Sequence, residues 1–285
     1  MIQLGVRLHD VNAQEPEVLQ TLEARAEKAR DEGFRCVHLA LSKCVRGVNF
    51  DEAALNEGLA AYIRREFRER ELDIAVLGCY LNLAHPDAEK LREFQSRYYG
   101  HLRVAALAGV GVVGTETGAP NAAYRLDANT HTPEALHTFM RNLEPVVACA
   151  ERCGVTLAIE PVFHHIVYDA DRALEVLRGI GSRNLRIIFD PVNLLAEENV
   201  GRREQVLGDA MDKLCDEIAV VHIKDYVRTD AGLKSVAAGE GEMDYTELLR
   251  FLKARKPFIQ ATLENTTNRN ASAARMLIEE LYQAV

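Results

Sequence analysis

Residues 185–193 read LRIIFDPVN, and this stretch indicates a fold with a parallel sheet. The segment 185–189 is apolar apart from Arg186, which is typical of a parallel strand buried on both faces. Asp190-Pro191 then ends the run, as a turn does after a strand. Similar short runs recur along the chain, so the sequence predicts eight strands, at residues 2–8, 36–41, 73–80, 110–116, 156–160, 185–190, 219–224 and 259–264.

Helical patterns separate the predicted strands. One helix begins at Thr132, where threonine is a suitable cap and Pro133 fits the first turn, and it continues to Gly154. Another covers residues 16–33 and ends at Gly33. Its apolar residues recur at helical spacing, at Val18, Leu22, Ala26 and Ala29. Two more helices are predicted at residues 169–180 and 245–255.

Eight strands that alternate with helices predict an α/β fold of the (β/α)8 barrel type, in a single domain over residues 1–285. Strand starts recur about every 30 to 45 residues, which is the length of one strand–helix unit. No Pro/Ser-rich linker or charge block marks a second domain. A doubly wound open sheet would require a glycine-rich loop after the first strand, and residues 8–12 contain no glycine.

Composition excludes several classes of function. Lys and Arg number 34 against 43 Asp and Glu, so a net charge of −9 disfavours a general electrostatic grip on nucleic acid. No apolar run approaches the roughly 18 residues of a membrane span, and the N-terminus does not resemble a signal peptide. The six cysteines are scattered without a CxxC motif. We therefore expect reduced thiols, a cytoplasmic location, and neither nucleic acid nor membrane as a partner.

Four consecutive predicted strands carry a polar residue at or near the carboxyl end. These residues are Glu160, Asp190, His222 and Glu264. Barrel enzymes place their active sites at that end, so the four side chains are expected to meet. Three crowded carboxylates repel one another unless a cation or protons compensate them. Three oxygen ligands and one imidazole suit a divalent ion such as Mn²⁺, Mg²⁺ or Co²⁺. Taken singly, each carboxylate is also a common helix cap or turn residue.

The chain resembles the xylose isomerase-like TIM barrels, a superfamily of sugar phosphate isomerases and epimerases that includes endonuclease IV-type repair enzymes. The resemblance covers nearly the whole chain, and five motifs carry it: residues 158–161 (AIEP), 189–193 (FDPVN), 221–225 (VHIKD), 239–245 (GEGEMDY) and 263–265 (LEN). It implies one divalent ion (Mn, Mg, Co or Zn) held by Glu160, Asp190, His222 and Glu264. It also implies that Glu160 and Glu264 act as catalytic acid and base.

The implied reaction is an isomerisation or epimerisation of a small sugar, keto-sugar or polyol derivative through an enediolate. A divalent ion that chelates a carbonyl and its neighbouring hydroxyl lowers the barrier to proton transfer as a Lewis acid. Epimerisation requires groups on both faces of the reacting carbon, and glutamates from strands five and eight supply one each. Relatives of this kind often form dimers or tetramers, so a homo-oligomer is possible here.

Four further residues are candidates for substrate binding. His165 follows Glu160 on the loop after strand five, and Glu116 ends strand four. Lys224 lies just beyond His222, where it would steady a developing negative charge or form an ion pair with a neighbouring loop. His85 ends the third unit at the expected rim of the barrel. For His165 the alternative is a solvated position on the loop.

Departures from the family patterns limit the choice of function. The repair enzymes use three metals and have histidines where this chain has Asn193 and Glu116, so a DNA-repair endonuclease is disfavoured. Ketose 3-epimerases also have a histidine at the position of Asn193, and an arginine closer to the strand-seven histidine than Arg228 is here. The substrate is therefore expected to differ. A lyase, dehydratase or hydrolase on the same metal, or a non-catalytic sugar-binding relative, are the alternatives.

Overall fold

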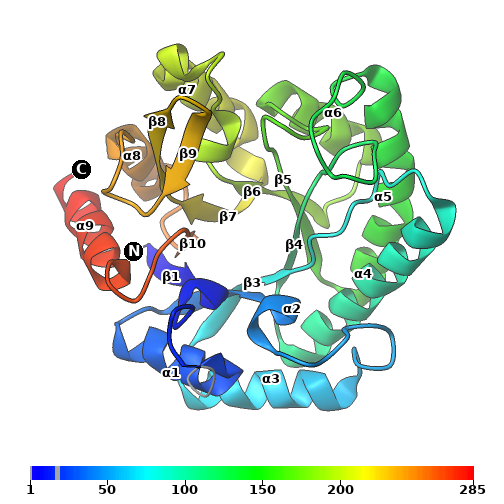
Figure 1. Ribbon diagram of the computed structural model, residues 1–285, viewed down its shortest axis with the longest axis horizontal. Helices are drawn as coiled ribbons and strands as arrows, with labels where there is room; N and C mark the ends of the chain where they lie inside the picture. The colour runs from blue at the N-terminus through cyan, green and yellow to red at the C-terminus, as the bar shows by residue number, and fades with distance from the viewer. Residues whose placement is uncertain (1, 17–19) are drawn as a thin grey trace.

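Eight parallel strands form a closed barrel in the computed structural model, which describes residues 2–16 and 20–285 (Figure 1). The predicted fold class is confirmed, and each predicted strand corresponds to a strand of the barrel. The strands are β1 (Gln3–Arg7), β2 (Cys36–Ala40), β3 (Asp73–Gly78), β4 (Val112–Glu116), β5 (Thr156–Glu160), β6 (Leu185–Phe189), β7 (Ile218–Ile223) and β10 (Gln260–Leu263). β1 closes the barrel because it pairs in parallel with both β2 and β10.

Helices surround the barrel as an outer ring, and α9 lies beside the N-terminal strand (Figure 1). The helices of the ring are α1 (Leu22–Asp31), α3 (Glu57–Glu69), α4 (Ala88–Ala108), α5 (Pro133–Cys153), α6 (Ala170–Ile180), α7 (Arg203–Leu214), α8 (Thr246–Arg255) and α9 (Ala271–Ala284). The short helix α2 (Leu41–Cys44) directly follows β2 and lies inside the ring (Figure 1). Short 3-10 turns lie at Leu8–Asp10, Val192–Leu194, Val200–Arg202 and Cys215–Glu217.

Caps set the helix boundaries much as the sequence predicts. The hydroxyl of Thr132 accepts a hydrogen bond from the backbone N–H of Ala135, and α5 ends at Gly154 in the left-handed conformation. The first predicted helix is shorter than expected. Its described part begins after Thr21, whose hydroxyl caps the N–H of Ala24, whereas the predicted Val18 lies outside the described residues.

Small and branched side chains fill the inside of the barrel. Six buried residues form this inner cluster, separate from the larger core between strands and helices: Cys36, Ala75, Val76, Ala158, Ile188 and Val220. Gly114 in β4 is part of the fit, since a Cβ there would lie 2.6 Å from both Ile188 Cδ1 and Val76 Cγ1. The inner strand positions therefore leave no room for one more methyl group.

A two-stranded antiparallel hairpin interrupts the regular strand–helix order after β7, and the sequence analysis did not predict it. It consists of β8 (Asp225–Thr229) and β9 (Gly232–Val236), beside α7 and α8 in Figure 1. The buried Asp225 carboxylate anchors it, because it accepts hydrogen bonds from the backbone N–H groups of Tyr226, Met243 and Gly239. Asp244, which precedes α8, accepts a hydrogen bond from the backbone N–H of Thr246.

The described part of the chain contains no helix that is both long and apolar enough to cross a membrane. The six cysteines are all free, and five of them are buried, while Cys153 is half-buried.

Two glycine-to-alanine substitutions test the packing inside the barrel. Gly114→Ala should lower the free energy of unfolding by about 1–3 kcal/mol, because the added methyl group overpacks the inner cluster. Gly208→Ala is the control in α7, where a Cβ meets nothing within 4 Å, and it should raise stability by up to about 1 kcal/mol. Urea denaturation of both variants measures the two changes, and a neutral Gly114→Ala would contradict this packing.

Candidate metal centre

The four predicted metal ligands converge at the carboxyl end of the barrel. Glu160 is the last residue of β5, and Asp190 and Glu264 directly follow β6 and β10. His222 Nδ1 lies 3.4 Å from Glu160 Oε1 and 3.3 Å from Glu264 Oε1. The ligand atoms of Glu160, Asp190 and His222 all lie within 4.8 Å of one another. All four side chains are buried, so this is a compact cluster of charge rather than a set of solvated rim residues.

Neighbouring groups fix the orientation of two of these carboxylates. Asp190 Oδ1 accepts hydrogen bonds from the backbone N–H groups of Val192 and Asn193, at 2.9 and 3.1 Å. The Asn193 side chain donates to Glu160 Oε1 at 2.7 Å. Asn193, which stands where related patterns have a histidine, therefore contacts both the strand-five and strand-six positions. The other oxygen, Asp190 Oδ2, is paired with a lysine instead of a backbone group.

Two cations contact the carboxylate cluster. Lys224 Nζ lies 2.7 Å from Asp190 Oδ2 and 3.4 Å from Glu264 Oε2. Arg7, at the end of β1, places Nη1 3.2 Å from the same Glu264 oxygen, and Asp10 holds its guanidinium by two further hydrogen bonds. Glu264 thus contacts two positive side chains, whereas the hydrogen bond that Glu160 accepts from Asn193 is a neutral one.

This unequal environment separates the proton affinities of the carboxylates. Burial raises the pKa of Glu160 to about 8, and the negative charge of Glu264 adds to the shift. Burial also raises the pKa of Asp190 to about 6, although Lys224 opposes the shift. For Glu264, burial acts in the same direction but is outweighed by His222 and Lys224, which hold its pKa well below the usual range. Glu264 is therefore the ionised partner and Glu160 the protonated one near neutral pH.

His38, which the sequence analysis missed, lies against the cluster together with its hydrogen-bond partner Tyr80. His38 in β2 stacks on His222, with ring centroids 5.1 Å apart and planes 10° from parallel. Its Nδ1 lies 3.5 Å from Glu264 Oε1, and its Nε2 lies 3.1 Å from the hydroxyl of Tyr80. Burial lowers the pKa of both His38 and His222. A signal for His38 was present, since it is the single polar residue in the run 36–41 before Ser42.

Among the predicted substrate-binding residues, Glu116 lies next to the cluster, because β4 pairs with β5 and Glu116 is the register partner of Glu160. Glu116 ends β4, where its Oε2 accepts a hydrogen bond from the Tyr124 hydroxyl at 3.1 Å. His165 Nδ1 lies 3.9 Å from the same oxygen, and its ring meets Tyr124 edge to face at 5.2 Å. Glu116 and His165 are thus brought together, through a tyrosine that the sequence analysis did not single out.

His85 lies apart from the other candidates. Its Nδ1 accepts a hydrogen bond from the backbone N–H of Asp87, and its ring packs edge to face on Phe94. Both contacts are with the beginning of α4. Its part in lining a substrate pocket stays a prediction.

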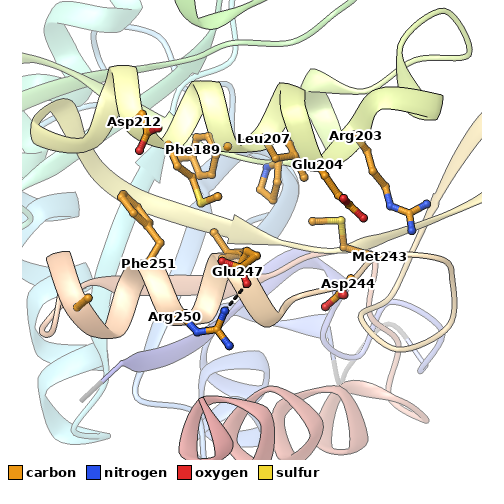
Figure 2. A pocket seen from close by; sticks show the side chains of 15 residues that line it. Phe189, Arg203, Glu204, Leu207, Asp212, Met243, Asp244, Glu247, Arg250 and Phe251 are labelled. Carbon is orange, nitrogen blue, oxygen red and sulfur yellow. Dashed lines mark hydrogen bonds and ion pairs between the residues drawn. The ribbon is translucent and has the colours of Figure 1, made fainter.

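A cavity of about 670 Å³ lies outside the barrel, between α7 and α8. Figure 2 shows the side chains of the two helices on either side of it, with Leu207 from α7 and Phe251 from α8 among them. Phe189 and Pro191, the neighbours of Asp190, form part of its wall. The predicted metal ligands are not among the described residues that line it, so this cavity is separate from the carboxylate cluster.

The raised pKa of Glu160 predicts how the stability of the metal-free protein changes with pH. The pKa of its carboxyl is about 8 in the folded protein against an ordinary value of 4.5, so its contribution to stability is lost as pH rises through that window. Relative to wild type, Glu160→Gln should therefore gain about 1.4 kcal/mol per pH unit across it. Urea denaturation at pH 5 and pH 8 with a chelator measures this, with the exposed Glu175→Gln as control. An advantage that is equal at both pH values would contradict the assignment.

Comparison with known proteins places the barrel in a family. No curated protein sequence matches the chain. Among solved structures, a D-tagatose 3-epimerase-like protein is 19% identical, covering 99% of this chain and 98% of its own with a TM-score of 0.76. The 3-keto-D-glucoside 4-epimerase of E. coli is 16% identical, covering 98% and 100%, with a TM-score of 0.73. The IolI protein with a bound zinc atom is 15% identical, covering 99% and 98%, with a TM-score of 0.72.

These likenesses are to the fold, whereas the family follows from the sequence itself. The model of the xylose isomerase-like TIM barrels matches residues 26–281, which is most of the chain. The resemblance inferred from the strand-end motifs is thereby confirmed. The chain belongs to the xylose isomerase-like TIM barrel family.

Proposed function

We propose that this protein is a divalent-metal-dependent isomerase or epimerase of a small sugar, keto-sugar or polyol derivative, with proton transfer through an enediolate. The observation that carries the proposal is the pair of buried glutamates, Glu160 and Glu264, that flank His222 at the carboxyl end of the barrel. The printed names of two structural neighbours, a D-tagatose 3-epimerase-like protein and a 3-keto-D-glucoside 4-epimerase, support the same class of reaction.

The residues of the cluster fit a divalent ion. Three carboxylates and one imidazole are buried together, which costs free energy unless positive charge is added. Glu160, Asp190, His222 and Glu264 would hold the ion, with Lys224 giving up its 2.7 Å contact with Asp190 Oδ2. When bound, such an ion polarises a carbonyl and its neighbouring hydroxyl as a Lewis acid. The zinc atom in the IolI neighbour supports a metal in this fold.

Proton transfer is assigned to the two glutamates, whose different surroundings suit different roles. Glu264, which Lys224 and Arg7 keep ionised, accepts the proton from the carbon next to the carbonyl. Glu160, the other glutamate that flanks His222, is assigned the proton transfer on the opposite face of that carbon.

Substrate binding is assigned to the part of the rim opposite Arg7. Glu116, Tyr124 and His165 form a connected polar group there, and polar groups of this kind hydrogen-bond sugar hydroxyls. Lys224 lies close enough to the carboxylates to steady negative charge as it develops on the substrate oxygen. His85 is assigned to the outer rim.

Metal content and hydrogen exchange test the proposed reaction. Mass spectrometry of protein purified without chelator or nickel should find about one divalent ion per chain, and His222→Ala should lose it. With a panel of keto-sugars in heavy water, the loaded protein should introduce deuterium next to the carbonyl. Glu160→Gln and Glu264→Gln should each slow this exchange by about 10²–10⁴-fold, because each removes a proton-transfer group.

Controls separate this reaction from its alternatives. Glu175→Gln alters an exposed glutamate of α6 and should leave the exchange rate unchanged. Loss of water from the substrate without deuterium exchange would instead indicate a dehydratase on the same residues. Full exchange by the Glu160→Gln and Glu264→Gln variants would overturn the assigned roles.

The contacts of Lys224 predict competition with the metal. Because its ammonium group lies beside Asp190 and Glu264, Lys224→Met should tighten divalent-ion binding at least about tenfold. The same change should lower the Tm of the metal-free protein, since buried carboxylates lose their cation. Titration calorimetry and thermal unfolding measure the two effects, with Lys43→Met, at an exposed lysine of α2, as control. Weaker metal binding by Lys224→Met would contradict this prediction.

A further inference from the structure

His38 occupies a position like that of a metal ligand, although it is not one of the four strand-end residues. Its side chain is 2% exposed and belongs to β2. In the barrel, β1 lies between β2 and β10, and Glu264 directly follows β10. A ligand atom from each of His38, His222 and Glu264 lies within 4.8 Å of the others. This group and the group formed by Glu160, Asp190 and His222 have His222 in common, so the two groups adjoin at that residue.

The spacing of the atoms matches that of ligands around one ion. With metal–ligand distances of about 2.1 Å, neighbouring ligand atoms lie about 3.0–3.4 Å apart in octahedral and tetrahedral sites. The His222 Nδ1 contacts with Glu160 and Glu264 measure 3.4 and 3.3 Å. The contact of His38 Nδ1 with Glu264 Oε1 measures 3.5 Å, so His38 differs little from the predicted ligands.

The hydrogen bonding of His38 leaves the same nitrogen free. Nδ1 is buried and has no hydrogen-bond partner among the described residues. Nε2 lies 3.1 Å from the Tyr80 hydroxyl, which acts as acceptor if the proton is on Nε2. A histidine that binds metal through one nitrogen usually donates the other N–H to an oxygen in this way, and that bond fixes the orientation of its ring.

The backbone of β3 makes room for this pair. A Cβ at Gly78 would lie 2.7 Å from His38 Nε2 and 2.6 Å from Tyr80 Cε2. Glycine at position 78 therefore lets the imidazole of His38 and the phenol of Tyr80 pack directly against the backbone of β3. Their arrangement depends on packing as well as on the hydrogen bond between them.

We propose that His38 Nδ1 is a further ligand of the metal centre, which would then contain two imidazoles, from His38 and His222. The inference rests on the proposed function, because it presupposes that an ion binds among the strand-end residues. Lys224 contacts Asp190 Oδ2 and Glu264 Oε2, whereas His38 Nδ1 lies beside the other oxygen of Glu264, Oε1. Two imidazoles favour zinc, cobalt and their neighbours over magnesium and manganese, which prefer oxygen ligands.

A variant pair tests the ligand role through metal selectivity. We expect His38→Gln to weaken Co²⁺ and Zn²⁺ binding at least about 100-fold, the upper end of what loss of an outer partner costs. Mg²⁺ and Mn²⁺ binding should change by less than about threefold, because these ions depend on the carboxylates. His9→Gln is the matched control, since His9 is a partly buried neighbour whose ring meets His38 edge-on at 6.3 Å. Competition titration with each ion alone gives the affinities.

A second measurement needs no variant and so does not depend on the folding of His38→Gln. Pulsed electron paramagnetic resonance of the Cu²⁺-loaded wild-type protein counts coordinated imidazoles, and two are expected. Tyr80→Phe should also lower Co²⁺ affinity by about 10–100-fold, because it removes the acceptor that orients the ring. One imidazole in the resonance spectrum, or equal Co²⁺ affinity in wild type and His38→Gln, would overturn the inference and leave the four-ligand centre intact. Wild-type protein that binds no divalent ion would overturn both.

Discussion

Crowded negative charge at one end of the barrel is the constraint on which the rest of the site depends. Glu160, Asp190 and Glu264 are buried within a few ångströms of His222, and in that setting three full charges would repel one another strongly. The negative charge of the three carboxylates is compensated partly by positive side chains and partly by a proton. Lys224 and Arg7 lie on the Glu264 side, and a proton is favoured on Glu160. The proposed acid and base follow from this division.

The barrel holds this arrangement because its strands bring distant residues together at fixed spacing. Parallel register places the ends of β5, β6, β7 and β10 at one face, although the residues they carry are spread over the chain from Glu160 to Glu264. Inside the barrel, close packing around Gly114 and Ile188 gives these strand ends a rigid base. Asn193 and the turn after β6 then fix the carboxylates at the level of side chains.

Strand ends were the part of the site that the sequence could predict. Glu160, Asp190, His222 and Glu264 each interrupt or follow an apolar run, and the barrel rule brings such residues to one face. Arg7, His38 and Tyr124 were missed because their roles arise from contacts between segments far apart in the sequence. The hairpin after β7 was missed for a similar reason, since its anchor is a single carboxylate that binds three backbone groups rather than a periodic pattern.

That anchor bears on how the chain could diversify. Asp225 closes the segment from Tyr226 to Met243 upon itself, so both ends of the insertion are fixed at one carboxylate directly after Lys224. The tip of the hairpin is exposed at residues 229–231, so changes of sequence are tolerated there more easily than in the barrel. Lengthening, shortening or exchange of this tip would therefore be a permissive route for evolution, in which the surface beside the mouth changes while the charged centre is inherited unaltered.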